Sequence, residues 1–177
     1  MNKHASSLNA AQMALAAIFT ALSVVLLYFA CVLPSGRLGL TAAAGFLPAA
    51  TVVSCGLKAG LLCYGGSGLL ALFLVSDKGL AMLYLLFFGL YPIVKGWIEK
   101  RRRLPVELCF KFAFFNLMFS LVLRVASALL LSLLPFGRAS TGLLYLLGNA
   151  VFLIYDFGLS KVICFYQKRM DQVLRKR

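Results

Sequence analysis

Acidic residues and histidine are scarce in this chain. Its 177 residues include 5 Asp and Glu and one histidine, His4, in the N-terminal tail. No two acids share an apolar segment, and the sequence has neither a glycine-rich phosphate loop nor the G-x-S-x-G turn of serine hydrolases. Acid–base, nucleophilic and phosphate chemistry all need such groups at close spacing. We therefore expect that the chain is not an enzyme.

Metal-binding cysteine pairs are also missing. The five cysteines are scattered through apolar segments, without a C-x-x-C pair or any other spacing typical of metal ligands. Free cysteine commonly behaves as a small buried apolar residue. We expect neither a metal site nor a bound cofactor.

Hydrophobic residues dominate the composition of the chain. They make up 62% of the chain, against 13% for charged residues, which is far more apolar than a soluble domain. Several charge-free runs approach or exceed the roughly eighteen apolar residues that a helix needs to cross a bilayer. We predict one all-α domain over residues 1–177, a polytopic membrane protein folded as a compact bundle of about six transmembrane helices. The predicted spans are 10–33, 38–55, 59–75, 79–98, 106–134 and 142–166.

Proline and glycine mark the predicted turns. The run from Pro34 to Arg37 ends the first span, and residues 56–60, with two glycines, form the next tight turn. Pro92 falls inside the fourth span and is expected to distort it, because proline cannot donate the helical hydrogen bond. Glycines 65, 66 and 68 lie within an apolar run, where they indicate close helix packing or bending.

The positive charge of the chain is distributed unevenly. There are 18 Lys and Arg, giving a formal net charge of +13. They cluster beside apolar runs, at 100–103 and in the tail 167–177, where anionic lipid headgroups attract them. We expect membrane lipids, and no nucleic acid, among the partners.

The same residues predict the orientation. One set of loops and span ends carries fourteen Lys and Arg, the other carries Arg37, Lys78 and Arg138, and Arg124 lies within a span. Basic residues favour the cytoplasmic side. We predict that both termini face the cytoplasm, that 167–177 forms a basic cytoplasmic tail lying as a helix at the interface, and that the protein is a multi-pass protein of a cell membrane.

Small side chains form a stripe on the first predicted span. The alanines concerned recur at spacings of four, three and four, and so share one helix face: Ala10, Ala14, Ala17 and Ala21. In lipid, small-x-x-x-small stripes promote helix association through close backbone contact. The stripe either packs against a neighbouring span or docks to a separate membrane subunit.

A polar and aromatic stripe runs along the sixth predicted span, through Tyr145, Asn149, Phe152 and Asp156. A carboxylate facing lipid is costly, so Asp156 is expected to face the bundle interior and pair with a cation in a neighbouring span. Arg124 and Lys95 are the candidate cations. The carboxylate either fixes the register of the helices or contacts a substrate.

Further aromatic and polar residues suit a pocket for a planar solute, because such pockets combine apolar walls with a few polar anchors. They are Tyr84, Tyr91, Tyr145 and Asn116. Tyr84 and Tyr145 lie in the outer halves of their predicted spans. Tyr91 adjoins Pro92 and is also explained by the helix distortion.

Together these features resemble the substrate-binding S component of energy-coupling factor transporters. The resemblance covers the whole chain as an architecture. It is carried by the segment from Ala14 to Ala21, with its A-x-x-x-A form at Ala17 and Ala21, and by the segments 88–95 and 148–156. None of these is a signature of a known vitamin-binding subgroup.

The resemblance implies a subunit that captures a small solute, typically a vitamin or its precursor, near the extracellular side of a bacterial plasma membrane. Members of the family dock through the alanine face of the first helix to a transmembrane coupling subunit, which carries two cytoplasmic ATPases. They hydrolyse nothing themselves, and the whole subunit topples in the membrane to deliver the solute. The loop after the first span, here the short run ending at Arg37, acts as a gate.

On this basis we predict a set of substrate-binding residues, comprising Arg37, Tyr84, Arg124, Tyr145, Asn149 and Asp156. The alternative is a non-transport membrane scaffold, similar to the small rod-shape-determining membrane subunit of bacterial wall synthesis. An outward-opening polar pocket near Tyr145 and Asn149 would favour transport. A sealed core with an exposed partner groove would favour the scaffold.

Overall fold

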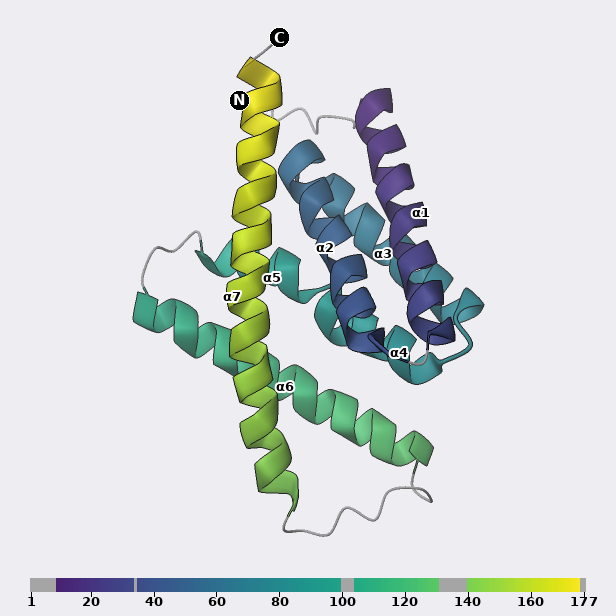
Figure 1. Cartoon of the computed structure of the whole chain (residues 1–177), viewed down its shortest axis with the longest axis vertical. Helices are drawn as coiled ribbons and strands as arrows, with labels where there is room; N and C mark the ends of the chain where they lie inside the picture. Colours follow the sequence, from purple (N-terminus) through teal and green to yellow (C-terminus); the bar gives the residue numbers. More distant parts are fainter. Residues whose placement is uncertain (1–8, 34, 100–103, 131–139, 176–177) are drawn as a thin grey trace, which may run out of the picture.

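The computed structural model is all-α (Figure 1). It describes residues 9–33, 35–99, 104–130 and 140–175. Within these residues, six helical segments are long and apolar enough to cross a membrane. The prediction of a six-helix membrane bundle is therefore confirmed. Helix α1 begins and helix α7 ends at the same end of the bundle, here called the inner end, and the turns after α1 and α3 lie at the opposite, outer end (Figure 1).

Three helices form the N-terminal half: α1 (Ala10–Val32), α2 (Arg37–Cys55) and α3 (Leu57–Leu74). The turns between them use glycines with positive φ, +79° at Gly36 and +90° at Gly56, a backbone conformation that glycine adopts without steric cost. The buried residues of α2 and α3 are mostly small, including Ala44, Gly45 and Ala71. Small side chains let the helix axes approach closely.

The fourth segment is broken, as its proline predicted. It comprises α4 (Lys78–Leu83), a π-helical turn η1 (Tyr84–Phe88) and α5 (Tyr91–Ile98). In η1 the N–H of Gly89 donates to the carbonyl of Tyr84, five residues earlier, at 2.8 Å. Pro92 has no N–H to donate to the carbonyl of Phe88, so the regular helix cannot continue through this point.

The distorted fourth segment packs closely against glycines of α2 and α3. A Cβ atom placed on Gly45 of α2 would overlap the carbonyl oxygen of Phe88, and one on Gly68 of α3 would overlap the side chain of Leu85. Gly68 belongs to the glycine-rich run 65–68; it packs closely, whereas a Cβ atom on Gly65 would meet nothing within 4 Å. The break in the fourth segment is built into the packing of α2 and α3.

Two long helices complete the fold. Helix α6 (Leu104–Leu130) crosses α7 (Ser140–Arg175) obliquely in Figure 1. The predicted fifth span reached 134, and its last residues lie outside the described part. The 36 residues of α7 span about 54 Å, well beyond the roughly 30 Å of bilayer hydrocarbon. The tail expected to lie at the interface instead continues α7 without a break to Arg175.

The buried side chains form two clusters of different character. One joins the segments from α1 to η1 and consists of four alanines together with Leu27, Val75, Leu80 and Tyr84. The other joins α5, α6 and α7 through aromatic rings, with Phe115 and Phe152 stacked at a centroid distance of 4.6 Å. Large apolar side chains such as Phe73 and Ile154 cover the outside, as expected for a surface that faces lipid.

Candidate functional site

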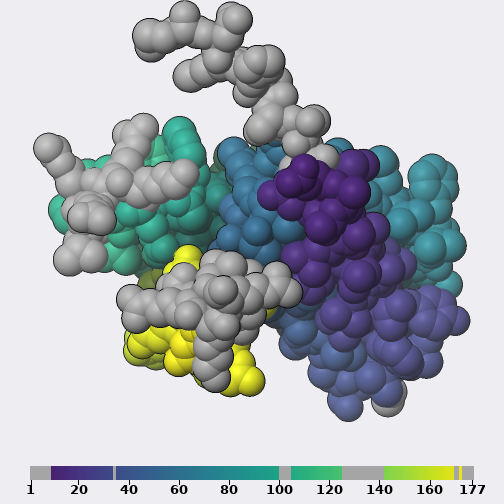
Figure 2. Space-filling model, turned by 90° about the horizontal axis from the view of Figure 1, so that it is seen from above, coloured from purple at the N-terminus to yellow at the C-terminus, as the bar shows by residue number. Residues whose placement is uncertain are grey.

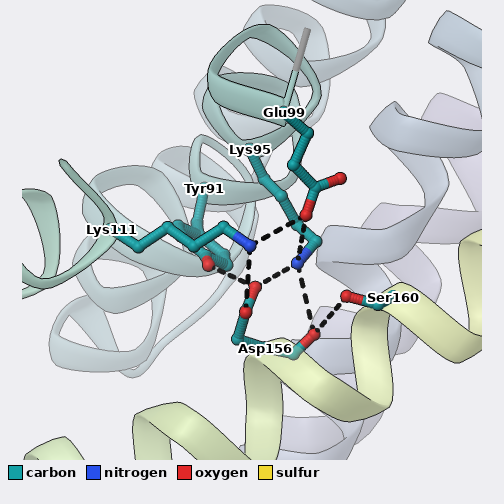
Figure 3. A network of polar contacts seen from close by, with 6 residues as sticks. All are labelled: Tyr91, Lys95, Glu99, Lys111, Asp156 and Ser160. Carbon is teal, nitrogen blue, oxygen red and sulfur yellow. Dashed lines mark hydrogen bonds and ion pairs between the residues drawn. The ribbon is translucent and has the colours of Figure 1, made fainter. Parts of the chain in front are cut away.

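The carboxylate of Asp156 lies where α5, α6 and α7 meet (Figure 3). One carboxylate oxygen accepts hydrogen bonds from the Tyr91 hydroxyl, at 2.5 Å, and from the ammonium group of Lys95. The other oxygen accepts from the ammonium group of Lys111 at 3.1 Å. Asp156 is thus bound from two other helices at once.

Glu99, at the C-terminal end of α5, completes this group. Its carboxylate lies 3.0 Å from the ammonium nitrogen of Lys95 and 2.8 Å from that of Lys111. The Lys95 side chain is 1% exposed and that of Asp156 is 15% exposed, whereas that of Glu99 is 41% exposed. The two lysines and two acids balance in charge. Burying such ions requires this pairing, because an unpaired charge away from water is costly.

We call the group formed by Lys95, Glu99, Lys111 and Asp156 the ion cluster. The sequence predicted part of it. Lys95 was one of two expected partners of Asp156, and the structure confirms it. Lys111 was counted among the fourteen basic residues of the cytoplasmic loops and span ends, and Glu99 was overlooked. The four-residue spacing of Lys95 and Glu99 on one helix was a usable signal, since such pairs face each other.

Two polar pairs join α6 to α7 on the outer side of the ion cluster. The side-chain amides of Asn116 and Asn149 exchange hydrogen bonds, both at 3.1 Å. The hydroxyls of Ser120 and Tyr145 share another at 2.7 Å. Asn149 and Tyr145 are therefore engaged with α6. A role in substrate binding stays a prediction for both.

Tyr84 forms hydrogen bonds to helices of the N-terminal half. Its side chain is fully buried, and its hydroxyl shares hydrogen bonds with Ser23 of α1 at 3.1 Å and Ser67 of α3 at 2.6 Å. The Ser23 hydroxyl also donates to the carbonyl of Ala44 in α2. In this structure the tyrosine links η1 to α1 and α3.

The two predicted arginines lie on α2 and α6. Arg37 is at the outer end, where its guanidinium donates to the carbonyls of Cys31 and Leu33 and lies 3.5 Å from Asp77. It therefore caps the C-terminal end of α1. Arg124 is exposed towards the C-terminal end of α6. Of the predicted substrate-binding residues, Arg37, Tyr84, Tyr145, Asn149 and Asp156 have different hydrogen-bond partners, and the three on α7 are spread along that helix.

An apolar groove with a volume of about 350 Å³ opens between η1, α6 and α7. Leu38, next to the outer turn of α2, and Leu144, near the start of α7, lie in its wall, which places it in the outer half of the bundle. A pocket with polar anchors was predicted, but neither Asn149 nor Tyr145 lines this groove. The aromatic residues that do are Phe87, Phe88, Phe115, Phe119, Phe152 and Tyr155.

A larger hollow of about 860 Å³ lies at the inner end, between α2, α5 and α7. Glu99 is the charged residue in its wall, and this carboxylate already pairs with Lys95 and Lys111. The hollow therefore adds no new charged group. In the described part of the chain, no group of three His, Cys, Asp or Glu side chains is placed to hold a metal ion.

The alanine stripe faces away from the bundle. All four of its members, Ala10, Ala14, Ala17 and Ala21, are exposed, and the buried residues of α1 lie on the opposite face. Helix α1 forms part of the outer surface of the molecule (Figure 2). Of the two alternatives, packing of the stripe against a neighbouring span of this chain is wrong.

No protein-family profile, no curated protein and no solved structure matches the chain. What is established is therefore the class: a multi-pass, six-helix membrane bundle with an ion cluster, an apolar groove and an exposed alanine face.

Proposed function

We propose that this chain is the membrane-embedded, substrate-binding subunit of an energy-coupling factor type uptake transporter. The exposed alanine face of α1 is the observation that carries the proposal. A helix surface that contacts only lipid has no need of small side chains. Four alanines in register leave a flat strip on which another helix can pack backbone to backbone.

The apolar groove also supports the proposal of a substrate-binding subunit. It lies in the outer half of the bundle, and its volume falls within the range of small-molecule sites. The alanine face is on α1, whereas the groove lies beside α6 and α7. A coupling subunit on α1 would leave the groove free to receive a solute.

The proposal is tested by affinity purification of the tagged chain from cells that produce it naturally, followed by mass spectrometry. We expect one transmembrane coupling protein and two ATPases to be retained in comparable amounts. Ala17→Trp should abolish their retention, because the larger side chain lifts the partner helix from the strip. Leu22→Trp is the matched control, since Leu22 is an exposed residue of α1 outside the alanine face.

Failure to retain ATPases with the wild-type chain would overturn the proposal, as would equal retention with Ala17→Trp. One observation favours the alternative, a non-transport scaffold. The polar residues of α7 are engaged with α6 or with the ion cluster rather than open to the outside. Retention of wall-synthesis proteins in place of ATPases, with the same dependence on Ala17, would establish that function.

A further inference from the structure

The groove between η1, α6 and α7 has the walls of a site for an apolar molecule. No charged side chain is among its lining residues. Aromatic rings approach it from three elements, with Phe87 on η1, Phe119 on α6 and Phe152 on α7. A charged solute would find no counter-ion there, and the desolvation of its charge would be uncompensated.

One polar atom in this region has no hydrogen-bond partner among the residues that the structure describes. The hydroxyl oxygen of Tyr155, a residue of the groove wall, is buried and makes no hydrogen bond within the described part of the chain. Nearby polar groups of α6 and α7 are engaged with one another, as in the Asn116–Asn149 pair. Buried hydroxyls are nearly always bonded, so an isolated one indicates a missing partner.

We propose that the groove binds an uncharged, largely apolar solute with a flat ring system and one hydrogen-bonding group that reaches Tyr155. Flat rings suit the site because aromatic walls favour stacked and edge-on contacts. A lipid acyl chain would fill the groove but leave the tyrosine hydroxyl without a partner. This inference deepens the proposed function and rests on it, since it names the class of solute that the subunit captures.

The test uses the full chain in lipid nanodiscs and two radiolabelled probes of similar shape. 2-Naphthol carries a hydroxyl where 2-methylnaphthalene carries a methyl group. Binding to empty nanodiscs is subtracted from each measurement. We expect saturable binding of 2-naphthol, with a dissociation constant about threefold to tenfold lower than that of 2-methylnaphthalene, the difference that one hydrogen bond typically makes.

Two variants connect the binding to the groove. Leu147→Trp places a bulky side chain in the groove wall, and Leu146→Trp makes the same change at an exposed residue of α7 outside it. The first should abolish binding of both probes and the second should leave it unchanged. Tyr155→Phe keeps the ring and removes the hydroxyl, so it should weaken binding of 2-naphthol to the level of 2-methylnaphthalene and leave the latter unaffected.

The outcomes that overturn the inference are distinct. Absence of saturable binding, or binding that persists in Leu147→Trp, removes the groove as the site. An equal effect of Tyr155→Phe on both probes removes the hydrogen bond. A lipid retained by the wild type and lost in Leu147→Trp, seen by native mass spectrometry, makes an acyl chain the occupant. None of these measurements involves a coupling subunit, so failure of the proposed function is seen separately, in the loss of ATPase retention.

Discussion

The two halves of the molecule are held together by different means. Helices α1, α2 and α3 pack through alanine, glycine and serine, with one tyrosine, Tyr84, bonded between them. Helices α6 and α7 contact each other through phenylalanine rings, polar pairs and the ion cluster. In a bilayer, where lipid tails are as apolar as the helices, both close backbone contact and interhelical hydrogen bonds can hold helices together. The groove opens beside the helices that are joined in the second way.

The largest expected effect is loss of the carboxylate in the ion cluster. Asp156→Ala leaves Lys95 and Lys111 with Glu99 alone, and we expect a loss of about 3 kcal/mol in stability, since breaking a buried ion pair strands its partner. Thermal unfolding in detergent measures it. Adding Lys95→Met leaves Lys111 paired with Glu99 and should restore much of the stability. A single variant as stable as the wild type would show that the cluster is not buried from water.

The next effect tests close packing in the other half. Gly45→Ala adds a methyl group that overlaps the carbonyl oxygen of Phe88, and backbone cannot move aside as a side chain can. We expect a loss of about 2 kcal/mol, a typical cost of overpacking. The matched control is Gly39→Ala on the same helix, where nothing lies within 4 Å. Similar stabilities for the two variants would contradict the contact between α2 and η1.

A smaller loss is expected at the hydroxyl of Tyr84. Tyr84→Phe keeps the ring and leaves the hydroxyls of Ser23 and Ser67 without it, so we expect a cost of about 1–2 kcal/mol. Tyr28→Phe, at an exposed position of α1, should change nothing. If Tyr84 instead contacts the solute, binding of 2-naphthol will fall in Tyr84→Phe while the melting temperature stays the same.

The smallest effect concerns the amide pair between α6 and α7. Asn149→Ala removes one interhelical pair, which in membrane proteins is worth about 0.6 kcal/mol on average. We expect a slight decrease in melting temperature and unchanged binding of 2-naphthol. Weakened binding of 2-naphthol at unchanged stability would instead support the substrate-binding role predicted for Asn149 from the sequence.

Much of the N-terminal half follows from the sequence. Apolar runs define the helices, Gly36 and Gly56 define the turns, and Pro92 predicts a break in the fourth segment. These features act locally or through burial alone. The exposure of the alanine stripe could not be predicted, because small residues suit internal packing and partner docking equally well.

The contacts of the C-terminal half depend on how α6 crosses α7, which no local pattern determines. Asp156 was expected to need a cation, but Lys111 was not among the candidates, which were chosen by similar depth in antiparallel spans, because it lies near the start of the predicted fifth span. Asn149 and Tyr145 share a helix stripe with Asp156. Their partners, Asn116 and Ser120, lie on α6 and reach them because α6 crosses α7 obliquely.

The length of α7 has a mechanical consequence. Asp156, bound by two lysines, divides the helix into arms of about 24 Å towards Ser140 and about 28 Å towards Arg175. For a straight rod held near its middle, a tilt of about 10° carries the two tips about 4–5 Å in opposite directions. The outer arm carries Leu144 and Gly148 of the groove wall, and the inner arm extends to the end of the bundle where α1 begins. If α7 rocks about its ion pairs, the groove wall and the inner end of the helix change position together.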